Sequence, residues 1–280
     1  MAGPDGGGTP PTQHGNSTCL QAGSGDYSKA GPYQVAMTSV DLASMLSGAQ
    51  SPTTYTIFAP ATLEANCPHP IVAWGNGTTV TGSSTYAFFN NNAASWGIVV
   101  IASDNPNVAM SPFLDTGIAY MLAQNNDSTS PYYQKLSTRT GVSGHSQGAF
   151  AATQASSSAM GVEAEVQVEG GGLPKAGIAF LALSGTADNI VGTMSPTQSY
   201  MSATGPSMLA IYTGADHTTT PTVGGYIQMN AGTIQFMRFY TAWWRCFLAD
   251  DQTACAMFKG GSSCGVCSDP NWNMLQTKNM

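Results

Sequence analysis

Residues 140–159 read TGVSGHSQGAFAATQASSSA and contain the motif G-x-S-x-G at residues 144–148, with Ser146 at the centre. A short apolar run precedes the motif and an Ala-rich, helix-compatible run follows it, which predicts a strand, a sharp turn and a helix. Side chains at the two glycine positions would collide with the neighbouring strand and helix. Such a turn holds the serine hydroxyl clear of the backbone at the helix N-terminus. Because the chain has 32 glycines, the same motif in an ordinary loop is the alternative.

Strands and helices alternate on both sides of this motif. Apolar or β-branched runs predict strands at residues 53–58, 70–74, 97–102, 140–143, 163–168, 178–183 and 208–212. Helical patterns are predicted at residues 85–96, 114–122, 147–159 and 233–248, and the aromatic stripe on the last of these is expected to pack in the core. This order predicts an α/β fold with one central, mostly parallel, doubly wound sheet flanked by helices.

Length favours a single domain. No charged or Pro-rich linker divides the middle of the 280 residues. We expect an extended N-terminal segment at residues 1–30 and one domain at residues 31–280 that ends in a Cys-rich tail. Residues 1–8 have no apolar signal-peptide core and resemble a mature N-terminus. No run reaches the 18 or so apolar residues that a membrane-spanning helix needs.

The charge content is low. Charged residues make up 8% of the chain, the formal net charge is −7, and no Lys or Arg occurs between Lys29 and Lys135. Without a basic stripe to hold a phosphate backbone, we expect no nucleic-acid partner. The same composition is compatible with neutral or insoluble substrates.

An even number of cysteines favours disulfides. The six residues allow 15 pairings and lie at Cys19, Cys67, Cys246, Cys255, Cys264 and Cys267. The last two have the CxxC spacing of zinc or redox sites, but no second ligand pair follows and the surrounding tail is rich in Gly and Ser. We therefore predict a secreted protein with disulfides, no metal centre and no cofactor.

A neutral serine needs a general base, which is usually histidine. The four histidines of the chain are His14, His69, His145 and His217. The first lies in the N-terminal segment, the second precedes a strand, and the third is beside the serine with its side chain directed elsewhere. His217 follows the strand predicted at residues 208–212, so it should lie at the same sheet edge as Ser146 and act as its base.

The acid that orients this base should lie between serine and histidine in the chain. Asp188 follows the strand predicted at residues 178–183 and emerges at the same edge. Asp216 is adjacent to His217, and neighbouring side chains diverge. Glu169, at the end of another strand, is the rival that stays open.

An oxyanion formed at Ser146 would need two N–H donors. The backbone N–H of Gln147, directly after the serine, is the first. The second is expected in the loop that follows residues 70–74, with Asn76 as first choice and Gly77 as second. The alternative is that this Asn-Gly pair only forms a tight turn.

Together, WGNG at 74–77, GHSQG at 144–148, Asp188 and His217 resemble the bacterial cutinase-like polyester hydrolases, which include the poly(ethylene terephthalate) hydrolases. The resemblance covers residues 53–260 or thereabouts. It implies a lidless α/β-hydrolase fold with an open cleft, flanked by His145 and Trp74, and a disulfide near the C-terminus. Two positions depart from the family. Asn76 stands where an aromatic residue is frequent, and residues 168–172 contain no Trp.

We therefore expect a monomeric, secreted serine ester hydrolase acting on a neutral ester or polyester, with Ser146, Asp188 and His217 as its triad. A general carboxylesterase or lipase, an acyltransferase with the same nucleophile, and a non-catalytic surface protein are the alternatives. We expect no membrane partner.

Overall fold

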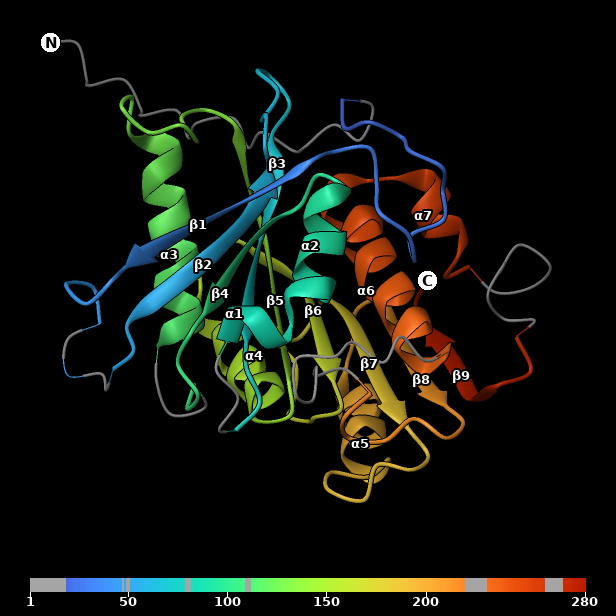
Figure 1. Cartoon of the computed structure of the whole chain (residues 1–280). Helices are drawn as coiled ribbons and strands as arrows, with labels where there is room; N and C mark the ends of the chain where they lie inside the picture. Colours follow the sequence, from blue (N-terminus) through green and yellow to red (C-terminus); the bar gives the residue numbers. More distant parts are fainter. Residues whose placement is uncertain are drawn as a thin grey trace, which may run out of the picture.

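A nine-stranded sheet forms the centre of the molecule in the computed structural model (Figure 1). The structure describes residues 19–46, 48, 51–78, 82–108, 112–219, 231–259 and 269–280. The strand order is β1-β2-β4-β3-β5-β6-β7-β8-β9. The strands are β1 (Val35–Asp41), β2 (Thr54–Pro60), β3 (His69–Gly75), β4 (Val99–Ser103), β5 (Leu136–His145), β6 (Val162–Val168), β7 (Ala179–Gly185), β8 (Ser207–Tyr212) and β9 (Trp272–Lys278). The chain therefore has the mixed α/β fold, mostly parallel, that its alternating pattern predicts.

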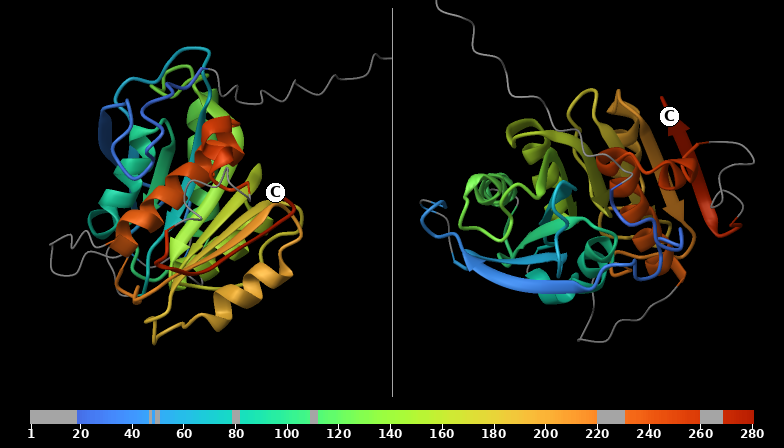
Figure 2. Two further views of the ribbon diagram at one scale, coloured as in Figure 1. Left: turned by 90° about the vertical axis from the view of Figure 1, so that its right-hand side faces the viewer. Right: turned by 90° about the horizontal axis from the view of Figure 1, so that it is seen from above.

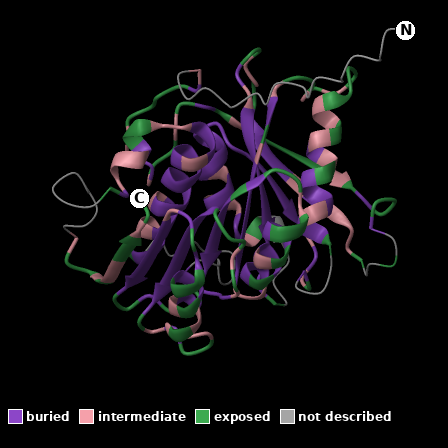
Figure 3. Ribbon diagram, turned by 180° about the vertical axis from the view of Figure 1, so that it is seen from behind, coloured by how far each residue is buried: buried purple, intermediate pink, exposed green. Residues whose placement is uncertain are grey.

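The strands from β3 to β8 run parallel, whereas β1, β2 and β9 join the sheet through antiparallel pairs. The central strands are buried along their length (Figure 3), as expected for a parallel sheet covered on both faces. All carboxyl ends of the parallel strands meet at one edge. Residues that follow these strands are thereby gathered there, whatever their distance in the sequence.

Helices cover both faces of the sheet (Figure 2). One face carries α2 (Ala87–Ser95) and α6 (Ala231–Ala249), and the other carries α3 (Phe113–Asn126), α4 (Gln147–Ser158) and α5 (Met194–Ser202). The short helices are α1 (Gly82–Thr85), which precedes α2, and α7 (Gln252–Ala256), which packs on α6.

Side-chain alternation along the strands divides the core into layers. In β4, Val100 and Ala102 pack under α2 and α6, whereas Val99 and Ile101 pack under α3 and α4. The aromatic stripe predicted for the C-terminal helix is core: Phe236, Tyr240 and Trp243 are 0% exposed.

Several elements differ from the sequence-based expectation. The helix predicted at 85–96 is interrupted at Tyr86, and the strand predicted at 140–143 begins earlier, at Leu136. The predicted N-terminal segment is not wholly a surface segment. Tyr27 is 1% exposed and its ring lies 4.5 Å from that of Trp96, so this side chain belongs to the core, whereas residues 21–24 of the same segment are exposed.

Two disulfides join described cysteines, Cys19–Cys67 and Cys246–Cys255. The predicted disulfide chemistry is confirmed for these four residues, while Cys264 and Cys267 lie outside the described residues. Disulfides are typical of oxidising compartments and point to an extracellular protein. Among the described helices, none has the length and apolar character needed to cross a membrane.

Candidate catalytic site

The motif at 144–148 forms a sharp turn between β5 and α4. Ser146 has φ 54° and ψ −120°, a backbone conformation that L-residues rarely adopt, and Gln147 begins the helix. A Cβ on Gly144 would overlap the main chain of Gly148, and one on Gly148 would overlap that of Gly75. The sequence therefore needs glycine at both positions to bring this helix against β3. Ser146 stays partly exposed.

Three side chains from separate strand ends form one hydrogen-bonded chain. Nε2 of His217 lies 2.9 Å from Oγ of Ser146, and Nδ1 of His217 lies 2.9 Å from Oδ2 of Asp188. Ser146 follows β5, Asp188 follows β7 and His217 follows β8. Because Nδ1 faces a carboxylate, it carries the proton, which leaves Nε2 as an acceptor for the serine hydroxyl.

The Asp188 carboxylate is held in place by main chain as well as by His217. Its Oδ1 accepts hydrogen bonds from the N–H groups of Ile190 (2.9 Å) and Val191 (3.0 Å). Burial of the carboxyl group works against ionisation, but the hydrogen bonds from His217, Val191 and Ile190 outweigh it and lower the pKa of Asp188. An ionised Asp188 both orients the imidazole and stabilises its protonated form.

The rival carboxylate, Glu169, contacts another histidine. It follows β6 with φ 47°, and its Oε2 lies 3.2 Å from Nε2 of His145. Potential ligand atoms of His145, Glu169 and His217 lie within 4.8 Å of one another. A metal ion at this place would compete with the hydrogen bonds that already occupy both imidazoles, so the donor set fits the hydrogen-bonded arrangement better than a metal centre.

His145 is predicted to flank a cleft, but it is 3% exposed. Its Nδ1 lies 2.9 Å from the Tyr86 hydroxyl and its Nε2 lies 3.0 Å from the carbonyl oxygen of His217. Burial lowers the pKa of His145 to about 4, and the hydrogen bond to His217 opposes this only in part. The imidazole of His145 is therefore neutral and lies on the interior side of the Ser146–His217 pair, not on its solvent side.

Trp74, the other predicted cleft residue, belongs to the core. Its side chain is 0% exposed and packs among the rings of Tyr86, Phe89 and Tyr240. Successive side chains of a strand point to opposite faces of the sheet. The side chain of Trp74 points to the face that α2 and α6 cover, and it is buried there.

The loop after β3 lies behind the turn at Ser146. The side chain of Asn76 is buried and donates to the carbonyl oxygens of Ser103 (2.5 Å) and Asn105 (3.1 Å), so it ties β3 to the end of β4. The N–H of Gly77 donates to the Tyr86 hydroxyl at 3.0 Å. Neither interaction is directed at Ser146, and any contribution of Asn76 to an oxyanion site would come from its main chain.

Tyr86 and Glu165 are polar core residues that the sequence pattern did not single out. Tyr86 is 0% exposed, and burial raises the pKa of its hydroxyl above the ordinary range. Glu165 lies on β6 beneath α4, and burial raises the pKa of its carboxyl group to about 7. Tyr86 lies inside a helical pattern and Glu165 inside a strand pattern. Neither pattern reveals which partner a side chain reaches.

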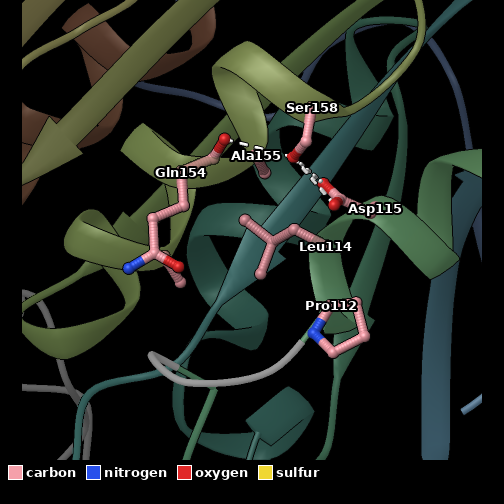
Figure 4. Close-up of a pocket in the computed structure, with 7 residues that line it drawn as sticks. Pro112, Leu114, Asp115, Gln154, Ala155 and Ser158 are labelled. Carbon is pink, nitrogen blue, oxygen red and sulfur yellow. Dashed lines mark hydrogen bonds between the residues drawn. The ribbon is translucent and has the colours of Figure 1, made fainter. Parts of the chain in front are cut away.

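A separate cavity of about 250 Å³ lies between α3 and α4. Figure 4 shows the carboxylate of Asp115 facing the hydroxyl of Ser158, which donates to it at 2.8 Å, with Leu114 and Gln154 beside them. None of the residues that line this cavity belongs to the hydrogen-bonded chain at Ser146.

Comparison with protein-family models found no match to the chain, and comparison with curated proteins found none either. Function is therefore inferred from the residues and their geometry.

Proposed function

We propose that this protein is a secreted serine ester hydrolase of the α/β-hydrolase type, with Ser146 as nucleophile, His217 as general base and Asp188 as the orienting acid. The observation that carries the proposal is the hydrogen-bonded chain Asp188–His217–Ser146, with both distances at 2.9 Å. The chain order Ser, Asp, His and the strand–turn–helix around Ser146 are those of the α/β-hydrolase fold.

The proposed reaction passes through an acyl-enzyme. Nε2 of His217 takes the proton of the Ser146 hydroxyl while Oγ forms a bond to the ester carbonyl carbon. The tetrahedral intermediate then expels the alkoxide, which leaves as an alcohol after taking the proton from His217. Water, deprotonated by the same imidazole, attacks the acyl carbon. The second tetrahedral intermediate then breaks its bond to Oγ of Ser146, and His217 returns the proton to Oγ, which releases the acid and restores the free serine.

Charge on the carbonyl oxygen is stabilised at the head of α4. The N–H of Gln147 is the first of the helix, where N–H groups lack intrahelical partners and the helix dipole favours negative charge. The second donor is proposed in the main chain of the Asn76 loop. Because the N–H of Gly77 is engaged by Tyr86, Asn76 remains the first choice between these two residues.

Exposed apolar side chains near the triad support a substrate with apolar groups. Phe150, one helical turn beyond Ser146, is 41% exposed, and Ile190, two residues beyond Asp188, is 73% exposed. A Cβ on Gly171 would lie 3.5 Å from the Phe150 ring, so the segment after β6 borders the same surface. Neutral esters, including water-insoluble polyesters, fit such a surface better than charged substrates do.

The test is hydrolysis of p-nitrophenyl acetate and butyrate by the wild type and by Ser146→Ala. We expect the substitution to lower kcat at least about a thousandfold, since the residual rate comes only from binding and oxyanion stabilisation. Equal rates in the two proteins would remove the proposal. Release of soluble acid from an amorphous polyester film, measured beside the small esters, tests the polyester part separately.

A further inference from the structure

A second hydrogen-bonded chain lies directly behind the triad. It starts at the N–H of Gly77, which donates to the Tyr86 hydroxyl at 3.0 Å. That hydroxyl lies 2.9 Å from Nδ1 of His145, and Nε2 of His145 lies 3.0 Å from the carbonyl oxygen of His217. The chain thus connects the loop after β3 to the main chain of the histidine that contacts Ser146.

The donors and acceptors of this chain determine its direction. A carbonyl oxygen only accepts, so Nε2 of His145 carries the proton and Nδ1 is the acceptor. The Tyr86 oxygen accepts from Gly77 and therefore directs its own proton to Nδ1 of His145. Every group in the series donates a hydrogen bond forward, an arrangement in which each bond polarises the next. At Nε2 of His145 the proton also faces Oε2 of Glu169 at 3.2 Å, beside the closer carbonyl oxygen of His217.

The surroundings allow little rearrangement. Tyr86 is 0% exposed and His145 3% exposed, and the Tyr86 ring packs 5.0 Å from that of Trp74. A Cβ on Gly77 would lie 2.8 Å from Nδ1 of His145 and 2.9 Å from the Tyr86 oxygen, closer than real Cβ atoms come. Only glycine therefore lets this loop approach the chain.

We propose that Tyr86 and His145 are positioning residues that couple the loop 76–78 to His217 and so hold the oxyanion-binding main chain and the general base in one geometry. This inference rests on the proposed function. His217 is then fixed at three points: Ser146 and Asp188 hold its ring, and His145 holds its main chain. Loss of the Tyr86 hydroxyl releases the loop end of the chain without touching a reacting atom.

The experiment compares Tyr86→Phe with Tyr55→Phe. Tyr55 is a matched control because its hydroxyl is also buried, donates to a main-chain oxygen (that of Phe113, 2.7 Å) and packs in the other core layer. For each variant kcat and KM are measured on p-nitrophenyl butyrate, together with the affinity for an alkyl boronic acid, whose tetrahedral serine adduct places an oxygen in the oxyanion site.

We expect Tyr86→Phe to lower kcat by about 10- to 100-fold, below the loss for a deleted oxyanion donor, with KM changed less than about threefold. Boronate affinity should fall by a similar factor, whereas Tyr55→Phe should leave all three values within about twofold. Gly77→Ala places a methyl group against Nδ1 of His145 and the Tyr86 oxygen, so it should disturb the same hydrogen bonds and change kcat, KM and boronate affinity as Tyr86→Phe does. A kcat loss for Tyr86→Phe no larger than for Tyr55→Phe would overturn the positioning role.

Amide hydrogen exchange at Gly77 provides a readout besides activity. Tyr86→Phe should accelerate exchange there at least about tenfold relative to Tyr55→Phe, since the N–H loses its acceptor. Unchanged exchange at Gly77 overturns the inference while leaving the ester hydrolase standing. A wild type no more active than Ser146→Ala overturns the proposed function and the positioning role with it.

Discussion

Asp216 precedes His217 directly in the chain, whereas Asp188 lies 29 residues before it. Only Asp188 forms a hydrogen bond with the imidazole ring of His217. Asp188 emerges from the end of β7 and points to Nδ1 of His217, whereas Oδ1 of Asp216 accepts from the N–H and hydroxyl of Thr218 within its own turn. We expect Asp188→Asn to lower kcat for ester hydrolysis about 10⁴-fold, because the amide favours the wrong imidazole tautomer. Asp216→Asn is the matched control and should stay within about threefold of wild type. Similar losses in both variants would contradict the assignment of the acid.

Glu165 leads to a prediction about stability and pH. Its Oε1 accepts from the Thr153 hydroxyl (2.8 Å) and from Nε2 of Gln167 (2.9 Å), both neutral partners. Burial raises the carboxyl pKa from about 4.5 to about 7, so the folded state holds a proton that the unfolded state has released. The contribution of Glu165 to the free energy of unfolding should therefore be fully present below pH 4.5 and be lost as the pH rises towards 7, by up to about 3 kcal/mol.

Glu165→Gln should remove this dependence because glutamine stays neutral. Urea unfolding at pH 5 and pH 8 measures it: the variant should gain stability relative to wild type at pH 8 and not at pH 5. Glu163→Gln is the control on the same strand, where the side chain forms a surface ion pair with Arg139, and it should leave the pH dependence intact. A stability difference between Glu165→Gln and wild type that is equal at the two pH values would contradict the assignment.

For single residues, the sequence predicted the positions of the candidate catalytic side chains better than their surroundings. Ser146, Asp188 and His217 follow predicted parallel strands, so sheet topology alone brings them to one edge. The sequence pattern did not predict that the side chains of His145 and Trp74 are buried. Whether the side chain beside Ser146 points to solvent or into the core depends on partners such as Tyr86, which lies far from His145 in the chain.

The turn between β5 and α4 requires the main chain at the start of α4 to lie directly against the main chain at the end of β3. A Cβ on Gly148 would overlap the carbonyl group of Gly75 and lie 2.8 Å from the carbonyl oxygen of Asn76. Gly148→Ala should therefore destabilise the protein by about 3 kcal/mol or more, since main chain cannot move aside as a side chain can. Urea unfolding is the measurement.

Gly117, a glycine inside α3, is the matched control. A Cβ there would lie 3.2 Å from a methyl group of Ile101, and alanine is favoured over glycine in a helix by about 1 kcal/mol, so the two effects oppose each other. Gly117→Ala should stay within about 1 kcal/mol of wild type. Equal destabilisation by both substitutions would show that the turn has no special requirement.

The sequence did not predict β1, β9 and α5, because these elements are exposed or polar and lack an apolar pattern. The strand β1 exposes most of its residues, including Met37, and β9 is only partly buried, so neither has the apolar run that revealed the central strands. Helix α5 has the polar sequence MSPTQSYMS, with few apolar positions to give a helical period. By contrast, the strands covered on both faces were all predicted, at least in part. Apolar runs revealed β3, β4, β7 and β8, and alternating apolar residues revealed β6 (VEAEVQV).

Across the molecule as a whole, the segment before β1 is joined to the body by several distant contacts. Arg245 on α6 is 1% exposed, pairs with Asp251, and donates to the carbonyl oxygens of Trp96 (2.9 Å) and Gln21 (3.4 Å). Cys19, in the same N-terminal segment as Gln21, is bonded to Cys67. The segment thus closes one side of the core, and its covalent link spans 48 residues, whereas Cys246–Cys255 spans 9.

These two spans give a ranking of stability losses. In the chain-entropy account a disulfide restricts the unfolded state more when it closes a longer loop, about 4 kcal/mol for the Cys19–Cys67 loop and about 2.5 kcal/mol for the Cys246–Cys255 loop. The double variant Cys19→Ser/Cys67→Ser should therefore lower the free energy of unfolding more than Cys246→Ser/Cys255→Ser, with urea denaturation as the measurement. Reduction of the wild type should cost at least as much as the larger of the two. If the Cys246–Cys255 pair proves the more stabilising, the entropy of loop closure does not decide the ranking, and the packing of α7 on α6 that this disulfide maintains must outweigh the effect of the longer loop.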